Sequence, residues 1–242
     1  MKLPELLAPA GGMEALKAAV ENGANAVYLG GSSFNARASA ANFSREELKE
    51  AVEYAHLRGV KVYTTVNILI DNGEIPELVD YVHHLYSIGV DAVILQDLGV
   101  ARLLRSILPE MPCHASTQMT LVNSPGVKFL QDLGFERVVL ARETAVKDME
   151  LIYRATGAEL EVFVHGALCI CYSGQCLMSS MIGGRSGNRG RCAQPCRLTY
   201  DLVDLTTNTR QRAEVGEHLL SPKDLNLVDY LKELAEAGVS SL

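Results

Sequence analysis

Residues 22–31, NGANAVYLGG, set a pattern that the rest of the chain repeats: an amphipathic helix ends at a glycine, and a strand-length apolar run follows. A glycine at this place is typical of a helix C-terminus, where one residue takes the left-handed backbone conformation. The apolar run, rich in Val, Ile, Leu and Tyr, suits a parallel strand that is buried on both faces. The joint recurs as RGVKVYTTVNIL (58–69), IGVDAVILQD (88–97), LGFERVVLAR (133–142) and TGAELEVFVHG (156–166).

Seven strands are expected in order along the chain. They are Glu5–Ala8, Ala26–Gly30, Lys61–Leu69, Ala92–Gln96, Cys113–Thr117, Arg137–Ala141 and Glu161–Val164. Helices are expected over residues 44–58, 76–88 and 125–133; Ser44 and Glu47 form a capping box at the start of the first. Alternating strands and helices with right-handed crossovers give an open doubly wound sheet or a closed barrel.

The last residues favour the barrel, because the joint returns there. After a hairpin arm at Leu198–Leu205 with a turn at Thr206–Asn208, a helix is expected near Asn226–Ala237, and Gly238 opens an eighth strand. We therefore expect an α/β protein with one TIM-like (β/α)8 barrel domain over residues 1–242. The barrel is expected to be incomplete, because the chain stops before the end of strand 8. A Cys/Gly/Arg-rich insertion over residues 167–200 is expected after strand 7.

Composition narrows the function classes. The net charge is −7, so an RNA or anion contact needs a local basic patch. No apolar segment reaches 18 residues, which excludes a membrane span. The first residues carry too short an apolar run, and the acidic Glu5, for a signal peptide. We expect a cytoplasmic, reducing compartment, in which clustered cysteines are ligands or redox groups rather than disulfides.

The segment Glu161–Arg197 holds five of the six cysteines. Gathered thiolates repel one another unless a cation neutralises them, so a metal or iron–sulfur site is the natural interpretation. Six residues separate Cys169 from Cys176, fifteen separate Cys176 from Cys192, and three separate Cys192 from Cys196. Zinc ribbons use closely spaced pairs, which only the last spacing matches, whereas a [4Fe–4S] cluster tolerates such irregularity. The alternative is that these cysteines pack as small buried hydrophobes.

Two further cysteines stand outside this set. Cys171 is an extra thiol, either packed or an alternative ligand, and Cys113 is expected to be a buried hydrophobe. A cysteine nucleophile is the competing hypothesis, with Cys169 or Cys171 paired to His165 or His114 as the base. The sequence has no G-x-S-x-G elbow and no H-E-x-x-H motif. The cluster is therefore preferred to a protease.

Polar side chains follow almost every expected strand. In barrels the chemistry lies where the strands end, so these residues should line one pocket. The lining predicted in this way is Asn35, Arg37, Asn67, Gln118, Arg142 and His165. His165, Arg142 and Gln118 are the candidates for a catalytic role, which the sequence leaves open. For any one of these residues a cap or loop hydrogen bond is an equal alternative.

The only concentrated positive charge in this acidic chain lies in the glycine-rich stretch 183–191, with Arg185, Arg189 and Arg191. A guanidinium suits phosphate or carboxylate, so this stretch is predicted to hold RNA, an anionic small molecule or the cluster itself. The alternative is a solvated loop without a ligand.

Several separated motifs resemble the collagenase-like peptidase family U32. They are EVFVHGALC (161–169), YSGQCLMS (172–179), LAPAGG (7–12), FNAR (34–37) and RCAQPCR (191–197). The resemblance covers essentially the whole chain. In that family the segment continues past residue 242, so this chain is expected to be cut short.

The resemblance carries functional expectations, which are an inference by analogy. Members of the family are implicated in oxygen-independent hydroxylation of ribosomal RNA, of wobble uridine in tRNA and of ubiquinone precursors. Such members hold a [4Fe–4S] cluster on four cysteines, which by position are Cys169, Cys176, Cys192 and Cys196. The resemblance implies that the partner is RNA or an anionic small molecule such as prephenate. Prephenate would be the hydroxyl donor. The alternatives are a collagenase-like peptidase and a non-catalytic binding module whose metal only staples the loop.

Overall fold

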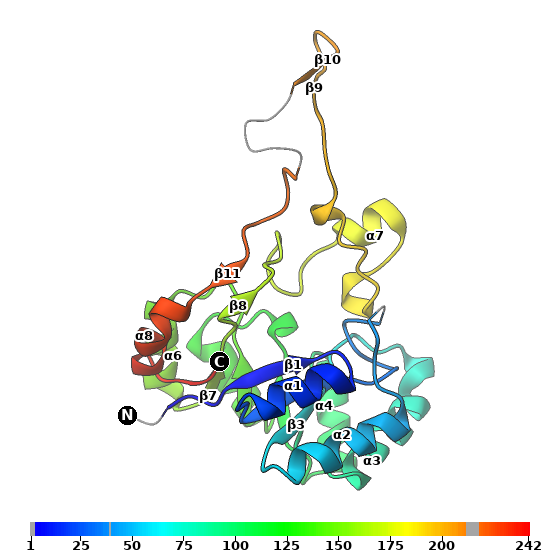
Figure 1. Ribbon diagram of the computed structural model, residues 1–242, viewed down its shortest axis with the longest axis vertical. Coiled ribbons are helices and arrows are strands. Elements are labelled where there is room, and N and C mark those ends of the chain that lie inside the picture. The colour runs from blue at the N-terminus through cyan, green and yellow to red at the C-terminus, as the bar shows by residue number, and fades with distance from the viewer. Residues whose placement is uncertain (1–2, 39, 212–217) are drawn as a thin grey trace.

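The computed structural model describes residues 3–38, 40–211 and 218–242. Eight parallel strands form one sheet, and a bridge between Glu5 and Ser241 joins the last strand to the start of the first (Figure 1). The strands are β1 (Leu7–Ala10), β2 (Ala26–Gly30), β3 (Lys61–Val66), β4 (Ala92–Leu95), β5 (Cys113–Ala115), β6 (Arg137–Val139), β7 (Glu159–Glu161) and β12 (Val239–Ser241). The predicted TIM-like barrel is confirmed, with an eighth strand in place.

Helices alternate with the strands and pack on the outside of the barrel. They are α1 (Met13–Glu21), α2 (Arg45–His56), α3 (Ile75–Ser87), α4 (Leu98–Ile107), α5 (Ser124–Asp132), α6 (Val146–Thr156) and α8 (Leu231–Glu236). The capping box is present, since Ser44 Oγ accepts from the Glu47 N–H and the Glu47 carboxylate accepts from the Ser44 N–H. The glycine of each of the five joints has a positive φ, as predicted. In the described part of the chain, no helix has the length and apolarity to cross a membrane.

The last predicted helix is wrong at its start, since a 3-10 helix over Val228–Tyr230 leads into α8. Residues Leu225–Asn226 form strand β11, which pairs antiparallel with β8 (His165–Gly166), and the helix starts only at Leu231. The first strand lies two residues later in the chain than predicted, and the seventh starts two residues earlier. Strand β3 ends three residues early, at Val66. The hairpin arm is confirmed, with β9 (Leu202–Asp204) paired to β10 (Thr209–Gln211).

Between β8 and β11 the chain leaves the barrel, and we call residues 167–224 the excursion. It carries helix α7 (Met178–Gly183) and rises to the β9–β10 hairpin at its tip (Figure 1). Its base lies on the loops that follow the barrel strands. The Ala38 N–H donates to the Gly190 carbonyl (3.1 Å), and Thr120 Oγ1 donates to the Ser173 carbonyl (2.6 Å). The excursion therefore covers the C-terminal mouth of the barrel, the end at which barrel enzymes carry their chemistry.

An ion network closes the opposite end of the barrel, and we call it the floor network. Arg137, with 6% of its side chain exposed, contacts Glu5 (2.5 Å), Glu159 (3.0 Å) and Glu161 (3.4 Å). The Tyr63 hydroxyl donates to the Glu5 carboxylate (2.9 Å). Every one of these charged groups has an opposite charge beside it, so the floor network is a structural element rather than an open pocket.

Candidate functional site

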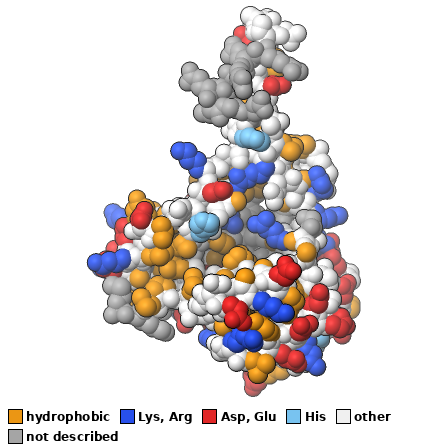
Figure 2. All heavy atoms as spheres, viewed as in Figure 1, with side chains coloured by type: hydrophobic (Ala, Val, Ile, Leu, Met, Phe, Trp, Pro, Cys, Tyr) orange, Lys and Arg blue, Asp and Glu red, His pale blue; other side chains and the backbone are white. Residues whose placement is uncertain are grey.

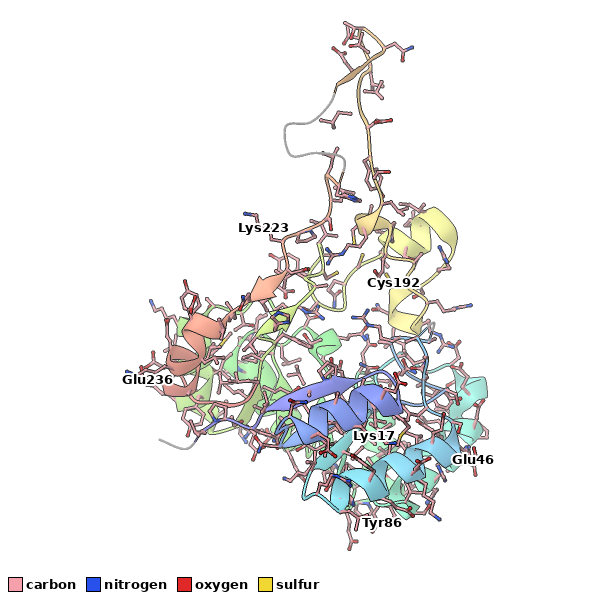
Figure 3. The ribbon with its side chains drawn as sticks, viewed as in Figure 1. Lys17, Glu46, Tyr86, Cys192, Lys223 and Glu236 are labelled. Carbon is pink, nitrogen blue, oxygen red and sulfur yellow. The ribbon has the colours of Figure 1, made fainter. Side chains whose placement is uncertain are left out.

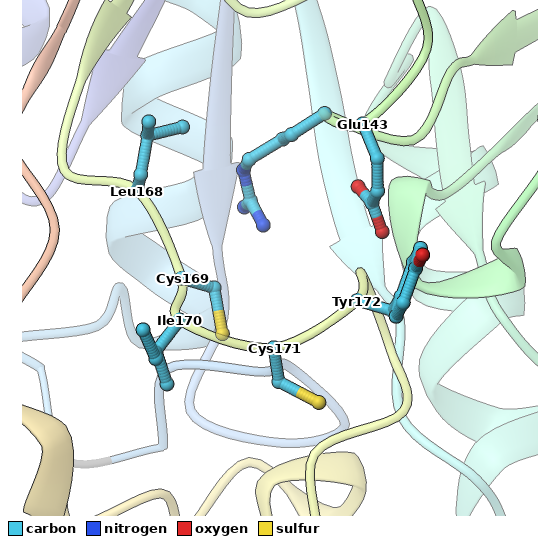
Figure 4. A pocket seen from close by; sticks show the side chains of 7 residues that line it. Glu143, Leu168, Cys169, Ile170, Cys171 and Tyr172 are labelled. Carbon is cyan, nitrogen blue, oxygen red and sulfur yellow. The ribbon is translucent and has the colours of Figure 1, made fainter. Parts of the chain in front are cut away.

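A cavity of about 280 Å³ lies where the loop after β6 meets the start of the excursion. It is lined by Arg142, Glu143, Leu168, Cys169, Ile170, Cys171 and Tyr172. In Figure 4 the aliphatic side chains of Leu168 and Ile170 stand on one side, Glu143 and Tyr172 stand on the other, and the sulfur atoms of two cysteines lie between them. The cavity thus combines an apolar wall, an aromatic ring, a guanidinium and thiols.

The thiols of the cysteine segment come together beside this cavity. Burial raises the pKa of Cys196, and the negative charge of Cys169 raises it further, followed by that of Cys192 and Cys176. Burial also raises the pKa of Cys171, and the thiols of Cys176 and Cys169 raise it further. All five cysteines are free. The four predicted ligands therefore lie within electrostatic range of Cys196, and their assignment as ligands stays a prediction.

This donor set fits a cluster by its chemistry. Within the described ranges, no three His, Cys, Asp or Glu side chains stand in an arrangement ready to hold a metal ion. The charges of Cys169, Cys176 and Cys192 instead disfavour the thiolate form of Cys196. A cation or a cluster that drew them together would remove this repulsion, because the thiolate is the form that binds metal.

Two arginines and a tyrosine lie within electrostatic range of one another at the mouth, where Arg37 is exposed and Arg142 is partly buried. Burial lowers the pKa of Arg142; the charge of Cys169 opposes this shift, and Arg37 adds to it. The Arg142 guanidinium lies 4.7 Å from the centre of the Phe163 ring. Burial raises the pKa of Tyr28, and the charges of Arg37 and Arg142 lower it. Among the residues that the structure describes, neither arginine forms an ion pair, so the mouth presents two cations to an anionic ligand.

Three other predicted pocket residues are engaged with the backbone. Asn35, which is 2% exposed, donates to a carbonyl of its own loop (2.5 Å) and accepts from the Arg37 N–H (2.6 Å). Asn67 Oδ1 accepts from the Ala36 N–H (2.9 Å), and Gln118 Nε2 donates to the Asn67 carbonyl (3.0 Å). These contacts show that the three amides hold the loops after β2, β3 and β5; a contact with substrate stays a prediction.

The predicted arginine stretch divides into one anchored and two exposed side chains. Arg189 donates to both carboxylate oxygens of Glu74 (2.5 and 2.7 Å) and approaches Asp71 (3.6 Å). The hydrogen bond from Arg189 lowers the pKa of Glu74 to about 2. Arg189 therefore fastens the excursion to the β3–α3 loop, while Arg185 and Arg191 are exposed.

The two histidines of the nucleophile hypothesis do not meet the thiols. His165 is exposed on β8. His114 is buried inside the barrel, where its ring lies edge-on to Tyr63 (4.7 Å between centres), and burial lowers its pKa to about 3. No hydrogen bond in the described part of the chain joins a histidine to a cysteine. A cysteine–histidine pair activated for nucleophilic attack is therefore not formed in this arrangement.

Sequence reasoning missed the residues that fix the turn beside the cavity. The Ser173 N–H and hydroxyl both donate to Glu143 (2.5 and 2.9 Å), and the Arg142 N–H donates to Ser173 Oγ (3.3 Å). Gly174 has φ +74°, and a Cβ there would lie 2.1 Å from the Gln118 carbonyl oxygen. These contacts join segments about thirty or more residues apart, so no local pattern could have revealed them.

Tyr28 and Phe163 were also missed, although a signal for Tyr28 existed. Side chains alternate between the two faces of a strand. In β2 the buried Val27 and Leu29 pack against the helices, which turns Tyr28 toward the barrel interior.

Comparison with known proteins identifies the family of this chain and several relatives. The model of peptidase family U32 matches residues 11–242. The chain is 41% identical over 245 residues to tRNA hydroxylation protein P1 of Bacillus subtilis, covering all of this chain and 58% of that protein. It is 42% identical over 237 residues to 23S rRNA 5-hydroxycytidine C2501 synthase of Escherichia coli, covering 98% of this chain and 35% of that protein.

The chain is also similar to a protein named as a collagenase and to a solved structure of a U32 peptidase. The chain is 32% identical over 246 residues to a collagenase of Porphyromonas gingivalis, covering 97% of this chain and 59% of that protein. The solved structure of the U32 peptidase Mk0906 superposes with a TM-score of 0.60 at 14% identity, covering 69% of this chain and 71% of that one, which shows the shared fold. The chain thus spans from about a third to three fifths of the length of these curated relatives.

Proposed function

Because this chain belongs to peptidase family U32, we propose that it forms the barrel of an RNA-modifying enzyme that hydroxylates a base of tRNA or rRNA without molecular oxygen. The proposal is supported by the charge effects of Cys169, Cys176 and Cys192 on Cys196, and of Cys169 on Arg142, at the mouth of the barrel. The relatives named for tRNA and 23S rRNA hydroxylation support it, since each matches nearly all of this chain.

The proposed cofactor is a [4Fe–4S] cluster held by Cys169, Cys176, Cys192 and Cys196. When bound, such a cluster supplies one-electron transfer. Zinc is the alternative occupant of the same thiols, and it would leave the site without redox chemistry. A reducing, cytoplasmic setting would keep the thiols available for either.

The arginines provide the binding groups. Arg142 and Arg37 lie in the mouth without a carboxylate partner among the described residues, and they would hold the carboxylate of an anionic hydroxyl donor such as prephenate. Arg185 and Arg191 are exposed on the excursion, where they would contact RNA phosphates. The net charge of −7 requires such a local basic surface, because the chain as a whole repels nucleic acid.

Purification without oxygen, followed by iron, sulfide and zinc analysis, tests the cofactor. We expect a coloured protein with iron and sulfide bound, and loss of both in Cys192→Ser. Cys171→Ser is the matched control, because it removes a thiol of the same segment outside the proposed ligand set. A colourless, iron-free wild-type protein would contradict the proposal.

Mass spectrometry of RNA nucleosides from a deletion strain tests the reaction. A hydroxylated pyrimidine should disappear from the deletion strain and return with the wild-type gene, but not with the Cys192→Ser gene. Retention of every modified nucleoside in the deletion strain would count against RNA hydroxylation.

Peptide cleavage is the second candidate function, which the collagenase relative favours. It predicts cleavage of collagen-like peptides that a thiol-blocking reagent and His165→Ala both abolish. A non-catalytic module would differ from both enzymes. In that case Cys192→Ser would release the excursion from the barrel while every RNA modification and peptidase activity stayed as in the wild type.

A further inference from the structure

Tyr172 combines a fixed backbone with an exposed ring. Its side chain is 66% exposed although it lines the cavity. Directly after it, Ser173 is held by three hydrogen bonds to Glu143 and Thr120, and Gly174 packs against the Gln118 backbone. The backbone next to the ring is therefore fixed, and the ring itself is left mostly exposed. An exposed aromatic ring at the edge of a cavity indicates a binding role rather than packing.

The surroundings of Tyr172 suit a flat, partly polar ligand. Across the cavity, Leu168 and Ile170 form an apolar wall, with Ile170 47% exposed (Figure 4). Arg142 lies in the lining with a guanidinium that can donate to ring carbonyl or nitrogen acceptors. A nucleobase has two such faces and an edge with acceptors, and unpaired RNA bases are commonly bound by stacking on aromatic side chains.

The charges where the excursion meets the barrel suit a nucleic acid. Figure 2 shows several basic side chains there, whereas acidic and basic side chains are mixed over the lower part of the barrel. Exposed cations beside an aromatic platform are typical of single-stranded nucleic-acid binding, in which the groove follows the phosphates and the ring stacks with a base.

We propose that Tyr172 is the stacking platform for one extruded base of an RNA, which enters the cavity between the tyrosine ring and the wall formed by Leu168 and Ile170. This inference rests on the proposed RNA function and assigns a recognition residue to it. Enzymes that act on a base take it out of its stack and hold it between aromatic and apolar side chains. Tyr172 is a positioning residue, and no step of the reaction is assigned to it.

The absence of tryptophan from the sequence gives a direct test. Tyr172→Trp places a single fluorophore at the cavity, and stacking with a base should quench its emission when a short single-stranded RNA is titrated. Tyr86→Trp is the matched control, because Tyr86 is also exposed (42%) and lies at the far end of the barrel from Cys192 (Figure 3). Its emission should stay unchanged across the same titration.

Two further variants separate stacking from folding. Tyr172→Phe keeps the ring and should bind the RNA as the wild type does. Tyr172→Leu removes the ring and should weaken binding by about 5- to 100-fold, the range expected for loss of one base–aromatic stack. Because the residue contributes only its backbone to the turn, circular dichroism and thermal unfolding should be the same for both variants.

The outcomes distinguish this inference from the proposed function. Unchanged emission of Tyr172→Trp at RNA concentrations that saturate the wild type overturns the inference, as does wild-type affinity in Tyr172→Leu. Failure of the wild type to bind any single-stranded RNA overturns it as well, whatever the iron content. Quenching in a protein that holds no iron and restores no hydroxylated nucleoside supports the stacking role and refutes the proposed reaction.

Discussion

The two ends of the barrel differ in the groups that surround an arginine. In the floor network Arg137 has three carboxylates within 3.4 Å and a side chain that is 6% exposed. At the mouth Arg142 is partly buried, and the described residues give it the Phe163 ring and the nearby charges of Cys169 and Glu143 but no ion pair. Burying a charge is costly unless an opposite charge offsets the loss of water. The floor network therefore pairs its arginine directly with carboxylates, whereas Arg142 at the mouth has no such direct pair among the described residues.

This difference indicates that the floor network contributes to stability and that the mouth contributes to function. Stable sites satisfy each polar group internally, and sites for ligands retain groups that only the ligand satisfies. Substitutions at the two ends should accordingly separate the free energy of unfolding from binding and activity. The four variants below run from the largest expected effect on stability to the smallest.

Removing the central cation of the floor network should have the largest effect. Arg137→Met leaves the buried Glu5 and Glu161 without their counter-ion, and we expect the free energy of unfolding to fall by about 3–5 kcal/mol. Urea titration followed by circular dichroism measures it. Arg185→Met, a similar change at an exposed site, should stay within about 0.5 kcal/mol of wild type. Equal loss in the two variants would remove the distinction between the ends of the barrel.

Neutralising Glu161 should change how stability depends on pH. Burial raises its pKa from 4.5 to about 7, with Glu5 adding to the shift and Arg137 opposing it. The folded state therefore favours the neutral acid, so this contribution is complete below about pH 4.5 and is lost as pH rises through 7. Relative to Glu161→Gln, wild type should lose on the order of 2 kcal/mol of unfolding free energy between pH 4 and 8.

Chemical denaturation at several pH values makes that measurement. Glu159→Gln is the matched control, because Glu159 contacts the same Arg137 but is 57% exposed. Its profile should follow the wild type closely. A constant difference between Glu161→Gln and wild type over the whole pH range would contradict the raised pKa.

Releasing the excursion should have a smaller, local effect. Arg189→Met removes the contacts with Glu74 and Asp71, and we expect a loss of about 1 kcal/mol, since both partners are partly exposed. Hydrogen exchange should show it best. The amides of Leu69 and Ala38, which donate to Asn188 and Gly190 of the excursion, should exchange faster.

The barrel itself provides the internal reference for that experiment. The Val93 amide donates to the Pro112 carbonyl within the sheet, so its exchange should be unaffected. Arg191→Met, a neighbouring exposed arginine, should leave all of these amides as they are in the wild type. Faster exchange at Val93 would mean that the whole barrel, rather than the excursion alone, is loosened.

Arg142→Met at the mouth should change stability least. The loss of the contact with Phe163 is offset by removal of an unpaired buried charge, so the unfolding free energy should stay within about 0.5 kcal/mol of wild type. Restoration of the modified nucleoside should nevertheless fall by about tenfold or more, the loss expected for one charged hydrogen bond to a ligand. Full activity with Arg142→Met would show that the mouth binds its ligand elsewhere.

The barrel could be predicted because its pattern is local. The positive-φ glycines such as Gly23 and Gly157 mark each helix end within a few residues of the following strand. The start of the last helix could not be predicted, since Leu225–Asn226 pairs with His165–Gly166 across about sixty residues. Local sequence favours a helix there, and a distant partner strand decides otherwise.

The candidate site could be predicted in composition but not in orientation. Cysteine spacing indicated which thiols belong together. In the structure the charges of Cys169, Cys176 and Cys192 all act on Cys196, but the assignment of the four as ligands stays a prediction. Nothing in the residue type tells whether an amide such as that of Asn35 turns to its own loop or to a ligand. Arg189 shows the same limit, because its partner Glu74 lies 115 residues away in the chain. Polar residues at strand ends therefore predict the place of a site better than its members.

The β8–β11 ribbon has a consequence for how such proteins can diversify. Gly166 and Leu225 are paired neighbours, so the chain departs from the cylinder and returns to it at a single point. A tight turn could replace everything between them without re-routing any barrel strand. The sulfur-bearing part is therefore joined to the barrel at one place, and its length can change without a change in the order of the barrel strands.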